Sequence, residues 1–182
     1  MTKWFDCMID LETMGLPPAG AIVSIGACMF DLDRCEIGPK FKRNINLATA
    51  VRDGGVIDAG TVCWWLTQGD DARKSILIDN YDIRQVLTEF GEWIAQHSSV
   101  KDVRVWGNGA AFDLTVLNSA YRRSDIRTPW SFSRERCFRT VRNMYPAVVY
   151  DPEQKGDGAH DALTDAIFQA EHLFAIKQRR AA

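Results

Sequence analysis

The sequence contains no long apolar run, no internal repeat and no low-complexity tract. Without an apolar run long enough to cross a bilayer, a transmembrane helix is excluded, and the N-terminal residues lack the apolar core of a signal peptide. Hydrophobic residues make up 46% and charged residues 25% of the 182 residues, which is ordinary for a globular protein. We therefore expect one domain, residues 1–182, with a substantial core and no contact with a membrane.

Cysteine is scarce and follows none of the spacings that metal sites or disulfide frameworks use. There are five cysteines, an odd number, and none forms a Cys-x-x-Cys pair. This pattern argues against a structural zinc site, and several of the thiols fall inside apolar segments. We expect them to be small buried hydrophobes in a reducing compartment, hence a cytoplasmic protein. They are Cys7, Cys28, Cys35, Cys63 and Cys137.

A strong excess of positive charge is also missing, since the net charge is −2. The charge is nevertheless uneven, because seven arginines and only Asp125 and Glu135 lie between Arg122 and Arg142, which makes this stretch +5. Such a basic stripe could hold phosphates beside an acidic site. The alternative for each single arginine is a solvated, partly ion-paired surface position.

Apolar segments near the N-terminus predict the strands of a sheet. Residues Trp4–Asp10 are apolar on both faces, which is typical of a central strand. Ala21–Phe30 has the same character, whereas Glu36–Asn46 alternates more and should lie nearer an edge. A hairpin at Asp31–Arg34 would join these two, and Val103–Trp106 predicts a further short strand.

Helical spacing of apolar residues predicts the rest of the architecture. Asp82–His97 keeps the i, i+3, i+4, i+7 pattern of an amphipathic helix. The fold class is therefore α/β, a mixed β-sheet flanked by α-helices. Pro152, Gly156 and Gly158 make Asp151–Ala159 the segment that we expect to be least ordered. Further helices are predicted at Thr61–Leu66, Ala110–Tyr121, Cys137–Met144 and from Leu163 to Phe174.

Acidic residues recur in a pattern that indicates metal chemistry. Asp10 and Glu12 are two residues apart, so on an extended strand both carboxylates point to the same side. Asp113 follows a glycine-rich turn, and His160 and Asp165 form His-x-x-x-x-Asp. Clustered carboxylates repel one another, and a divalent metal relieves that repulsion while creating a site for phosphoryl transfer. The set predicts a metal-dependent nuclease.

Three motifs that carry these residues resemble those of the DEDDh exonuclease family. They are Asp10-Leu11-Glu12-Thr13-Met14-Gly15, Asn108-Gly109-Ala110-Ala111-Phe112-Asp113 and His160-Asp161-Ala162-Leu163-Thr164-Asp165-Ala166. The histidine five residues before the last aspartate is typical of the histidine branch rather than the tyrosine branch. The adjacent tryptophans Trp64 and Trp65 and the segment 136–140 are further similar to small bacterial and phage-encoded exonucleases and exoribonucleases.

The resemblance extends over nearly the whole chain and implies an RNase H-like, DnaQ-like fold and a 3′→5′ exonuclease. It implies single-stranded DNA or RNA 3′ ends as the substrate and 5′-mononucleotides as the products. Relatives in this family often pair, so a homodimer is one expectation.

Two divalent ions, Mg²⁺ or Mn²⁺, are the expected cofactors, because hard carboxylate oxygens favour them. Asp10 would bridge both ions, Glu12 and Asp165 would hold the ion on the nucleophile's side, and Asp113 would help to hold the other. His160 would act as general base on the attacking water, since histidine titrates near neutral pH.

Each residue also has a structural alternative. Asp10 and Glu12 could be surface acids on an edge strand, and Asp113 could cap a helix. His160 could be an ordinary loop residue. Asp161 is the expected cap of the last helix and is given no catalytic role.

Substrate contacts are predicted around the first motif and the tryptophan pair. The resemblance implies that the segment after Glu12 meets the terminal nucleotide. Adjacent tryptophans on a helix cannot both face one way, so one would pack inward while the other stacks on a base. The alternative places both in the core or at an interface. The predicted substrate-binding residues are Thr13, Met14, Gly15, Trp64, Trp65 and Phe112.

Three functions follow from these observations. The first is a 3′→5′ exonuclease on DNA or RNA, and the second is an exoribonuclease for short or 3′-tailed RNA. The third, from a different class, is a non-catalytic nucleic-acid-binding protein that kept the fold. The complete set of acidic residues and the histidine argues against the third.

Overall fold

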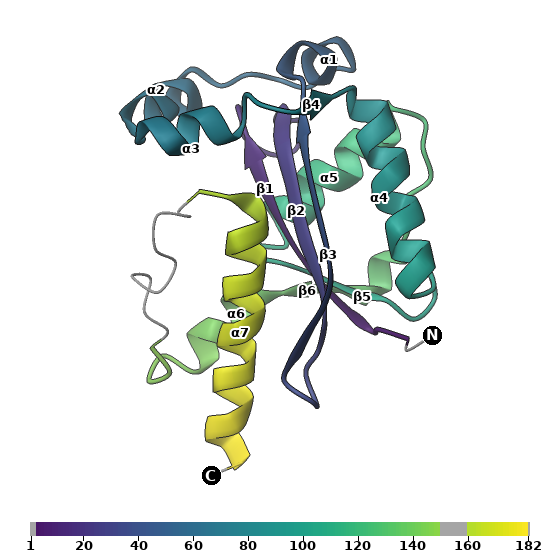
Figure 1. The fold of residues 1–182 in the computed structure, drawn as a ribbon, viewed down its shortest axis with the longest axis vertical. Coiled ribbons are helices and arrows are strands. Elements are labelled where there is room, and N and C mark those ends of the chain that lie inside the picture. The colour runs from purple at the N-terminus through teal and green to yellow at the C-terminus, as the bar shows by residue number, and fades with distance from the viewer. Residues whose placement is uncertain (1–2, 150–159, 182) are drawn as a thin grey trace.

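The computed structural model describes residues 3–149 and 160–181, and in this part of the chain six strands form one mixed sheet (Figure 1). The strand order is β4-β3-β2-β1-β5-β6. The first three strands pair antiparallel, whereas β5 pairs parallel to β1 and β6 parallel to β5. The strands are β1 (Asp6–Thr13), β2 (Ile22–Asp31), β3 (Glu36–Ile45), β4 (Asn80–Tyr81), β5 (Arg104–Gly107) and β6 (Glu135–Cys137).

Strand β1 is central, as its apolar character predicts, because it lies between β2 and β5 and is buried at every position. It covers Asp6–Thr13 rather than the predicted Trp4–Asp10. The strand continues past Asp10 because antiparallel pairing with β2 extends through Glu12, opposite Ser24, before the register shifts at Thr13. Both acidic residues of the first motif therefore lie inside a central strand.

The other predicted strands agree with the structure to within about one residue at each end. The predicted hairpin between β2 and β3 is confirmed, and the Asp31 carboxylate accepts hydrogen bonds of 2.8 Å from the backbone N–H groups of Asp33 and Arg34. Only the two-residue strand β4 lies outside β3, so β3 is close to the sheet edge as predicted.

Helices cover both faces of the sheet (Figure 1). Helices α4 (Ile83–His97) and α5 (Asp113–Arg123) pack on the face that carries Ile9 and Leu11 of β1. Helices α6 (Phe138–Met144) and α7 (Ala162–Ala181) pack on the opposite face, which carries Met8. The α/β architecture with a flanked mixed sheet is therefore confirmed.

Short elements account for most differences from the predicted architecture. Helices α1 (Leu47–Arg52) and α3 (Asp70–Ser75), the short strands β4 and β6 and a 3₁₀ turn at Phe132–Arg134 were not predicted. Each is too short to show a period of its own.

Several predicted helix bounds differ from those in the structure, and α7 runs to Ala181 rather than ending at Phe174. Helix α5 begins at Asp113 rather than Ala110, because the Gly109 carbonyl closes a turn with the N–H groups of Phe112 and Asp113. Cys137 ends strand β6 instead of starting α6. Helix α2 (Ala59–Thr67) extends slightly beyond its predicted bounds. The segment Asp151–Ala159 lies outside the described residues.

The predicted burial of the cysteines is only partly correct. Cys7 and Cys28 are fully buried in β1 and β2, and all five thiols are unpaired. Cys63 is exposed, because α2 turns this side of the helix to solvent, and Cys35 and Cys137 are half-buried. No helix among the described residues is both long and apolar enough to cross a membrane.

The start of α7 lies directly on strand β2 at Gly26. A Cβ atom on Gly26 would come within 2.1 Å of the Ala162 carbonyl carbon and the Leu163 nitrogen, so no side chain fits there. In the β1–β2 ladder Gly26 is the partner of Asp10. The glycine therefore lets the first turn of α7, which carries Asp165, approach the strand that carries Asp10.

We predict that Gly26→Ala lowers stability by about 2 kcal/mol or more, because the added methyl group must push the α7 backbone away. For a chain of this size that is a fall of roughly 4–8 °C in the thermal midpoint. The nuclease activity that the sequence predicts should fall as well, since Asp165 moves with the helix. Circular dichroism melting measures the first effect.

Gly69→Ala is the matched control, because no atom lies within 4 Å of the position of its added Cβ. It should lower the thermal midpoint much less than Gly26→Ala does, since Gly69 only precedes the short exposed helix α3. Equal thermal midpoints for the Gly26→Ala variant and the unaltered chain would contradict the close packing of α7 on β2.

Candidate active site

Three carboxylates meet where α7 starts on the sheet. One oxygen from each of Asp10, Glu12 and Asp165 lies within 4.8 Å of the others. Asp10 and Glu12 are each only 8% exposed on an interior strand, so the alternative of surface acids on an edge strand is wrong. The two-residue spacing correctly predicts that the side chains of Asp10 and Glu12 lie on the same face of β1. Helix α7 supplies the third carboxylate.

Asp113 stands just outside this group, at the start of α5. It is buried, and its Oδ2 accepts a hydrogen bond of 3.1 Å from the N–H of Gly109. The position that caps α5 is Phe112, so the helix-cap alternative does not account for Asp113. Asp113 is nevertheless close enough that its charge acts on Asp10.

Burial makes two of the carboxyl groups, those of Asp10 and Asp113, hard to ionise. Burial raises the pKa of Asp10 well above its usual range, and the charges of Asp113, Glu12 and Asp165 raise it further. Burial also raises the pKa of Asp113 to about 6, against the opposing effect of the Gly109 N–H. A divalent cation would restore the ionised forms, and the all-oxygen donor set fits Mg²⁺ or Mn²⁺.

Gln169 is a site residue that the sequence analysis missed. Its Nε2 donates a hydrogen bond of 2.7 Å to Asp10 Oδ1, and the residue is 4% exposed. The amide fixes the orientation of Asp10 and acts to lower its pKa. Gln169 follows Asp165 by four residues, so both lie on one face of α7, and this spacing is the signal that could have found it.

His160 lies in the turn before α7 and packs against the tryptophan pair. Its ring centroid is 4.9 Å from that of Trp64 and 6.5 Å from that of Trp65, both in edge-on geometry. Its backbone φ is +64°, in the left-handed region that few residues other than glycine adopt. The histidine is thus half-buried among aromatic rings rather than on an open loop.

Asp161 caps the last helix, as predicted. Its Oδ1 accepts hydrogen bonds from the backbone N–H and the hydroxyl of Thr164 at 3.0 and 3.1 Å. Its Oδ2 forms an ion pair with Lys42 of β3. These contacts fix the start of α7 over the sheet.

The two tryptophans differ in burial, as predicted by the alternative in which one of them packs inward. Trp65 is 4% exposed and donates a 2.9 Å hydrogen bond from Nε1 to the Thr13 carbonyl, whereas Trp64 is 42% exposed. The exposure of Trp64 rules out that both lie in the core, whereas a place at an interface stays a prediction. Trp65 ties α2 to the end of β1, and Trp64 presents its ring beside the site.

A pocket of about 400 Å³ adjoins the carboxylates at the end of β1. Met14 and Trp65 do not line it, because Met14 packs partly into the core and Trp65 is buried. Gly15 must be glycine, since a Cβ there would lie 2.0 Å from the Val56 carbonyl oxygen. Of the predicted substrate-binding residues, Thr13, Gly15, Trp64 and Phe112 line the pocket together with Glu12.

The arginine-rich stretch approaches the site only in part. The Arg139 backbone N–H donates to the Asn108 carbonyl, and the charge of Arg139 acts to lower the pKa of Asp113. Arg142 lies on α6 in a second pocket with Gln169. Arg122 and Arg127 line a different pocket, beside Trp130.

Comparison with known proteins identifies relatives of this site and fold. The family model described as the 3′-5′ exoribonuclease Rv2179c-like domain matches residues 6–177. The chain is 24% identical to an exodeoxyribonuclease of Enterobacteria phage T4, with 88% of this chain and 84% of that protein covered. It is 28% identical to the 3′-5′ DNA exonuclease Cap18 of Escherichia coli, with 92% and 88% covered.

Solved structures show the same fold at low sequence identity. A zinc-bound complex of E. coli ExoI with single-stranded DNA matches all of this chain with a TM-score of 0.71 and 16% identity. The chain spans only 42% of that ExoI chain. The nuclease domain of 3′hExo, a DEDDh family member bound to rAMP, matches 97% of this chain and 93% of its own, with a TM-score of 0.59 and 15% identity.

The family model covers nearly the whole chain, including all three acidic motifs, and the structural matches have the RNase H-like sheet that the motifs predict. The resemblance to DEDDh exonucleases is confirmed. The chain belongs to the family of 3′-5′ exoribonuclease Rv2179c-like domains, and it is a metal-dependent 3′-5′ exonuclease.

Proposed function

We propose that the chain hydrolyses single-stranded DNA from its 3′ end and releases 5′-mononucleotides, with Asp10, Glu12, Asp113, Asp165 and His160 as its catalytic set. The observation that carries the proposal is the group of three carboxylates within 4.8 Å of one another, two buried and one half-buried, beside a pocket at the end of β1. That pocket is wide enough for part of a nucleotide and has aromatic rings on its wall.

Asp10, Glu12 and Asp165 would hold a divalent ion, and Asp113 would contribute to a second one, magnesium or manganese in each case. When bound, such ions supply a nucleophilic hydroxide and neutralise the charge that develops on the phosphate. Gln169 keeps Asp10 in a fixed orientation for this role, since its amide hydrogen bond leaves the other Asp10 oxygen available.

His160 is proposed as the general base. It accepts a proton from the attacking water, whose oxygen bonds to phosphorus while the bond to the 3′-oxygen of the preceding nucleotide breaks, and that oxygen takes up a proton from solvent and leaves as a 3′-hydroxyl group. The phosphate stays on the released nucleotide as a 5′-monophosphate. Contact with Trp64 and Trp65 limits the freedom of the His160 ring, and it holds the histidine next to the pocket.

The terminal nucleotide is proposed to occupy the pocket beside Glu12. Trp64 and Phe112 offer aromatic surface to its base, and Thr13 and Gly15 offer backbone and small side chains to its sugar. Met14 and Trp65 would support this wall from behind, since neither lines the pocket.

Single-stranded DNA is proposed as the preferred substrate, because two relatives that cover most of the chain are described as DNA exonucleases. The family description favours RNA as the second candidate. A cytoplasmic location and pairing into a homodimer stay predictions.

Replacement of Asp10 by Ala or of Asp165 by Asn should abolish nuclease activity, with a fall of at least about a thousandfold. Each change removes a negatively charged carboxylate from the cation site. The measurement is the release of mononucleotides from 3′-labelled single-stranded oligonucleotides with and without Mg²⁺. The unaltered chain should act only with the metal, and DNA should be degraded faster than RNA of equal sequence.

Closed single-stranded circles and oligonucleotides with a 3′-phosphate serve as controls, and both should resist the enzyme. Full activity of the two variants would mean that the activity comes from a contaminating nuclease. The chain itself would then be better described as a non-catalytic nucleic-acid-binding protein. Faster degradation of RNA would favour the exoribonuclease instead.

The metal-free chain should lose stability as the pH rises through the window between the ordinary aspartate pKa of 3.8 and the Asp113 pKa of about 6. In that window the folded chain holds protons that the unfolded chain has released, so unfolding becomes easier at higher pH. Asp10→Asn removes one of the repelling groups and should raise the metal-free thermal midpoint at pH 7.5 by a few degrees.

The comparison uses melting curves in chelator at pH 5 and pH 7.5. The advantage of Asp10→Asn should shrink at pH 5, and Mg²⁺ at pH 7.5 should stabilise the unaltered chain more than the variant. A variant less stable than the unaltered chain at pH 7.5 without metal would refute the repulsion among these groups.

Truncation of the two tryptophans should have different effects. Trp64→Ala should raise KM for a single-stranded oligonucleotide by about tenfold through lost stacking while leaving the thermal midpoint almost unchanged. Trp65→Ala should destabilise the fold by about 3 kcal/mol or more, because it removes a buried ring and its hydrogen bond to Thr13. Steady-state kinetics and melting curves measure both, and similar losses of stability in the two variants would contradict this division.

A further inference from the structure

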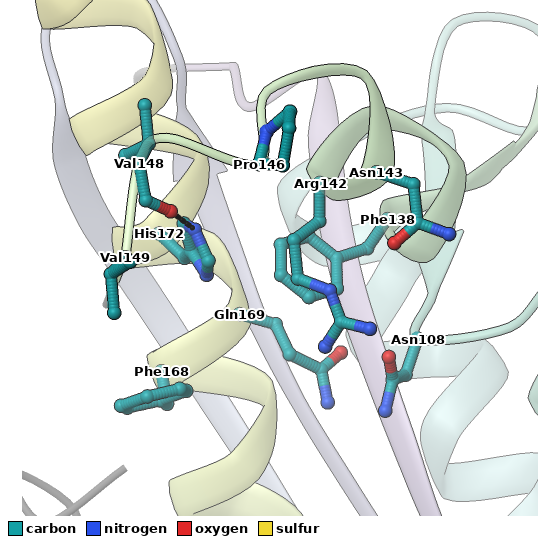
Figure 2. Close-up of a pocket in the computed structure, with 10 residues that line it drawn as sticks. All are labelled: Asn108, Phe138, Arg142, Asn143, Pro146, Val148, Val149, Phe168, Gln169 and His172. Atoms are coloured by element: carbon teal, nitrogen blue, oxygen red, sulfur yellow. Dashed lines mark hydrogen bonds between the residues drawn. The ribbon is translucent and has the colours of Figure 1, made fainter. Parts of the chain in front are cut away.

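A second pocket of about 400 Å³ opens between α6 and α7 (Figure 2). Gln169 belongs to its wall and also binds Asp10, whereas Glu12 belongs to the wall of the pocket at the end of β1. The carboxylates therefore stand between two pockets. The second pocket is lined by Asn108, Phe138, Arg142, Asn143, Pro146, Val148, Val149, Phe168, Gln169 and His172.

Two buried oxygen atoms on the wall of this second pocket have no hydrogen-bond partner among the described residues. They are Oε1 of Gln169, a residue that is almost fully buried, and Oδ1 of Asn108. In Figure 2 the side chains of Gln169, Asn108 and Arg142 all point toward the same part of the pocket. Buried acceptors without a donor are unfavourable, so a ligand with N–H or O–H groups would be stabilised here.

The remaining wall supplies one positive charge and an apolar surface. The Arg142 guanidinium lies 5.9 Å from the ring centroid of Phe138, and among the described residues that line the pocket none is acidic. Phe168, Val148 and Val149 add apolar area. A cation for a phosphate, acceptors for hydroxyl or amino groups and an apolar wall for a base match the parts of a nucleotide.

We propose that this pocket binds the nucleotide on the 5′ side of the scissile phosphate, with the phosphate of that nucleotide on Arg142. The inference rests on the proposed function, because it assigns the other side of the same cleaved bond. A phosphodiester always joins two nucleosides, and the carboxylates have one pocket on each side. The terminal nucleotide occupies the pocket with Trp64 and Phe112, and its neighbour occupies the pocket with Arg142 and Gln169.

Arg142→Gln tests the proposal by comparing two substrates. A single-stranded oligothymidylate fills both pockets, whereas the p-nitrophenyl ester of thymidine 5′-monophosphate has no nucleotide on the leaving side. The variant should raise KM for the oligonucleotide by about tenfold and reduce the slope of log KM against log salt by about 0.7, the value of one lost phosphate contact on a single strand. Hydrolysis of the nitrophenyl ester should stay within twofold of that of the unaltered chain.

Arg142→Lys should recover most of the oligonucleotide KM, because it keeps the charge, and it distinguishes lost phosphate binding from lost packing on Phe138. Arg84→Gln is the charge-matched control, since Arg84 lies on α4, on the opposite face of the sheet. It should leave both substrates and the salt slope unchanged.

Equal loss on both substrates in Arg142→Gln would overturn the proposal, because the residue would then act on the carboxylates rather than on a neighbouring nucleotide. An unchanged oligonucleotide KM and salt slope would overturn it as well. Absence of activity on both substrates in the unaltered chain would overturn the proposed function and this inference together, an outcome distinct from the other two.

Discussion

The contact between the start of α7 and Gly26 of β2 is the constraint on which the site depends. Because Gly26 has no side chain, the helix backbone lies directly against the strand beside Asp10. The hydrogen bonds of Asp161 with Thr164 and its ion pair with Lys42 hold the helix in that position. Asp165, one turn further along α7, therefore reaches the two carboxylates of β1. A shift of the helix by the width of a methyl group would move Asp165 away from them.

Bringing these carboxylates together is unfavourable without a cation, and the rest of the fold must tolerate it. Apolar cores on both faces of the sheet surround the site, and they make β1 a rigid and water-poor support for Asp10 and Glu12. The same burial raises the pKa of Asp10 and Asp113, so the groups needed for metal binding are those that destabilise the empty chain. The same residues thus affect both stability and function. Gln169 reduces the cost of ionising Asp10 by donating a hydrogen bond to it from an uncharged amide.

The arrangement around the carboxylates gives the site a direction. On one side, α2 contributes Trp64 above a pocket at the end of β1, and His160 is held between α2 and α7. On the other side, α6 and α7 enclose the pocket with Arg142. A strand of nucleic acid that crosses the carboxylates would meet aromatic rings first and then a guanidinium group. Such an order suits an enzyme that holds a chain end on one side and the remaining chain on the other.

Local patterns in the sequence determined the central strand, the common side of Asp10 and Glu12, the amphipathic helix α4 and the three motifs, because strand and helix periods are properties of neighbouring residues. Only the tertiary structure decided that β1 continues to Thr13, which tryptophan is buried, and that Gln169 supports Asp10. These features depend on contacts between distant segments, such as the hydrogen bond between residues 159 positions apart. No local period encodes such contacts, so the sequence defines the chemistry of the site while packing of α7 and α2 on the sheet defines its shape.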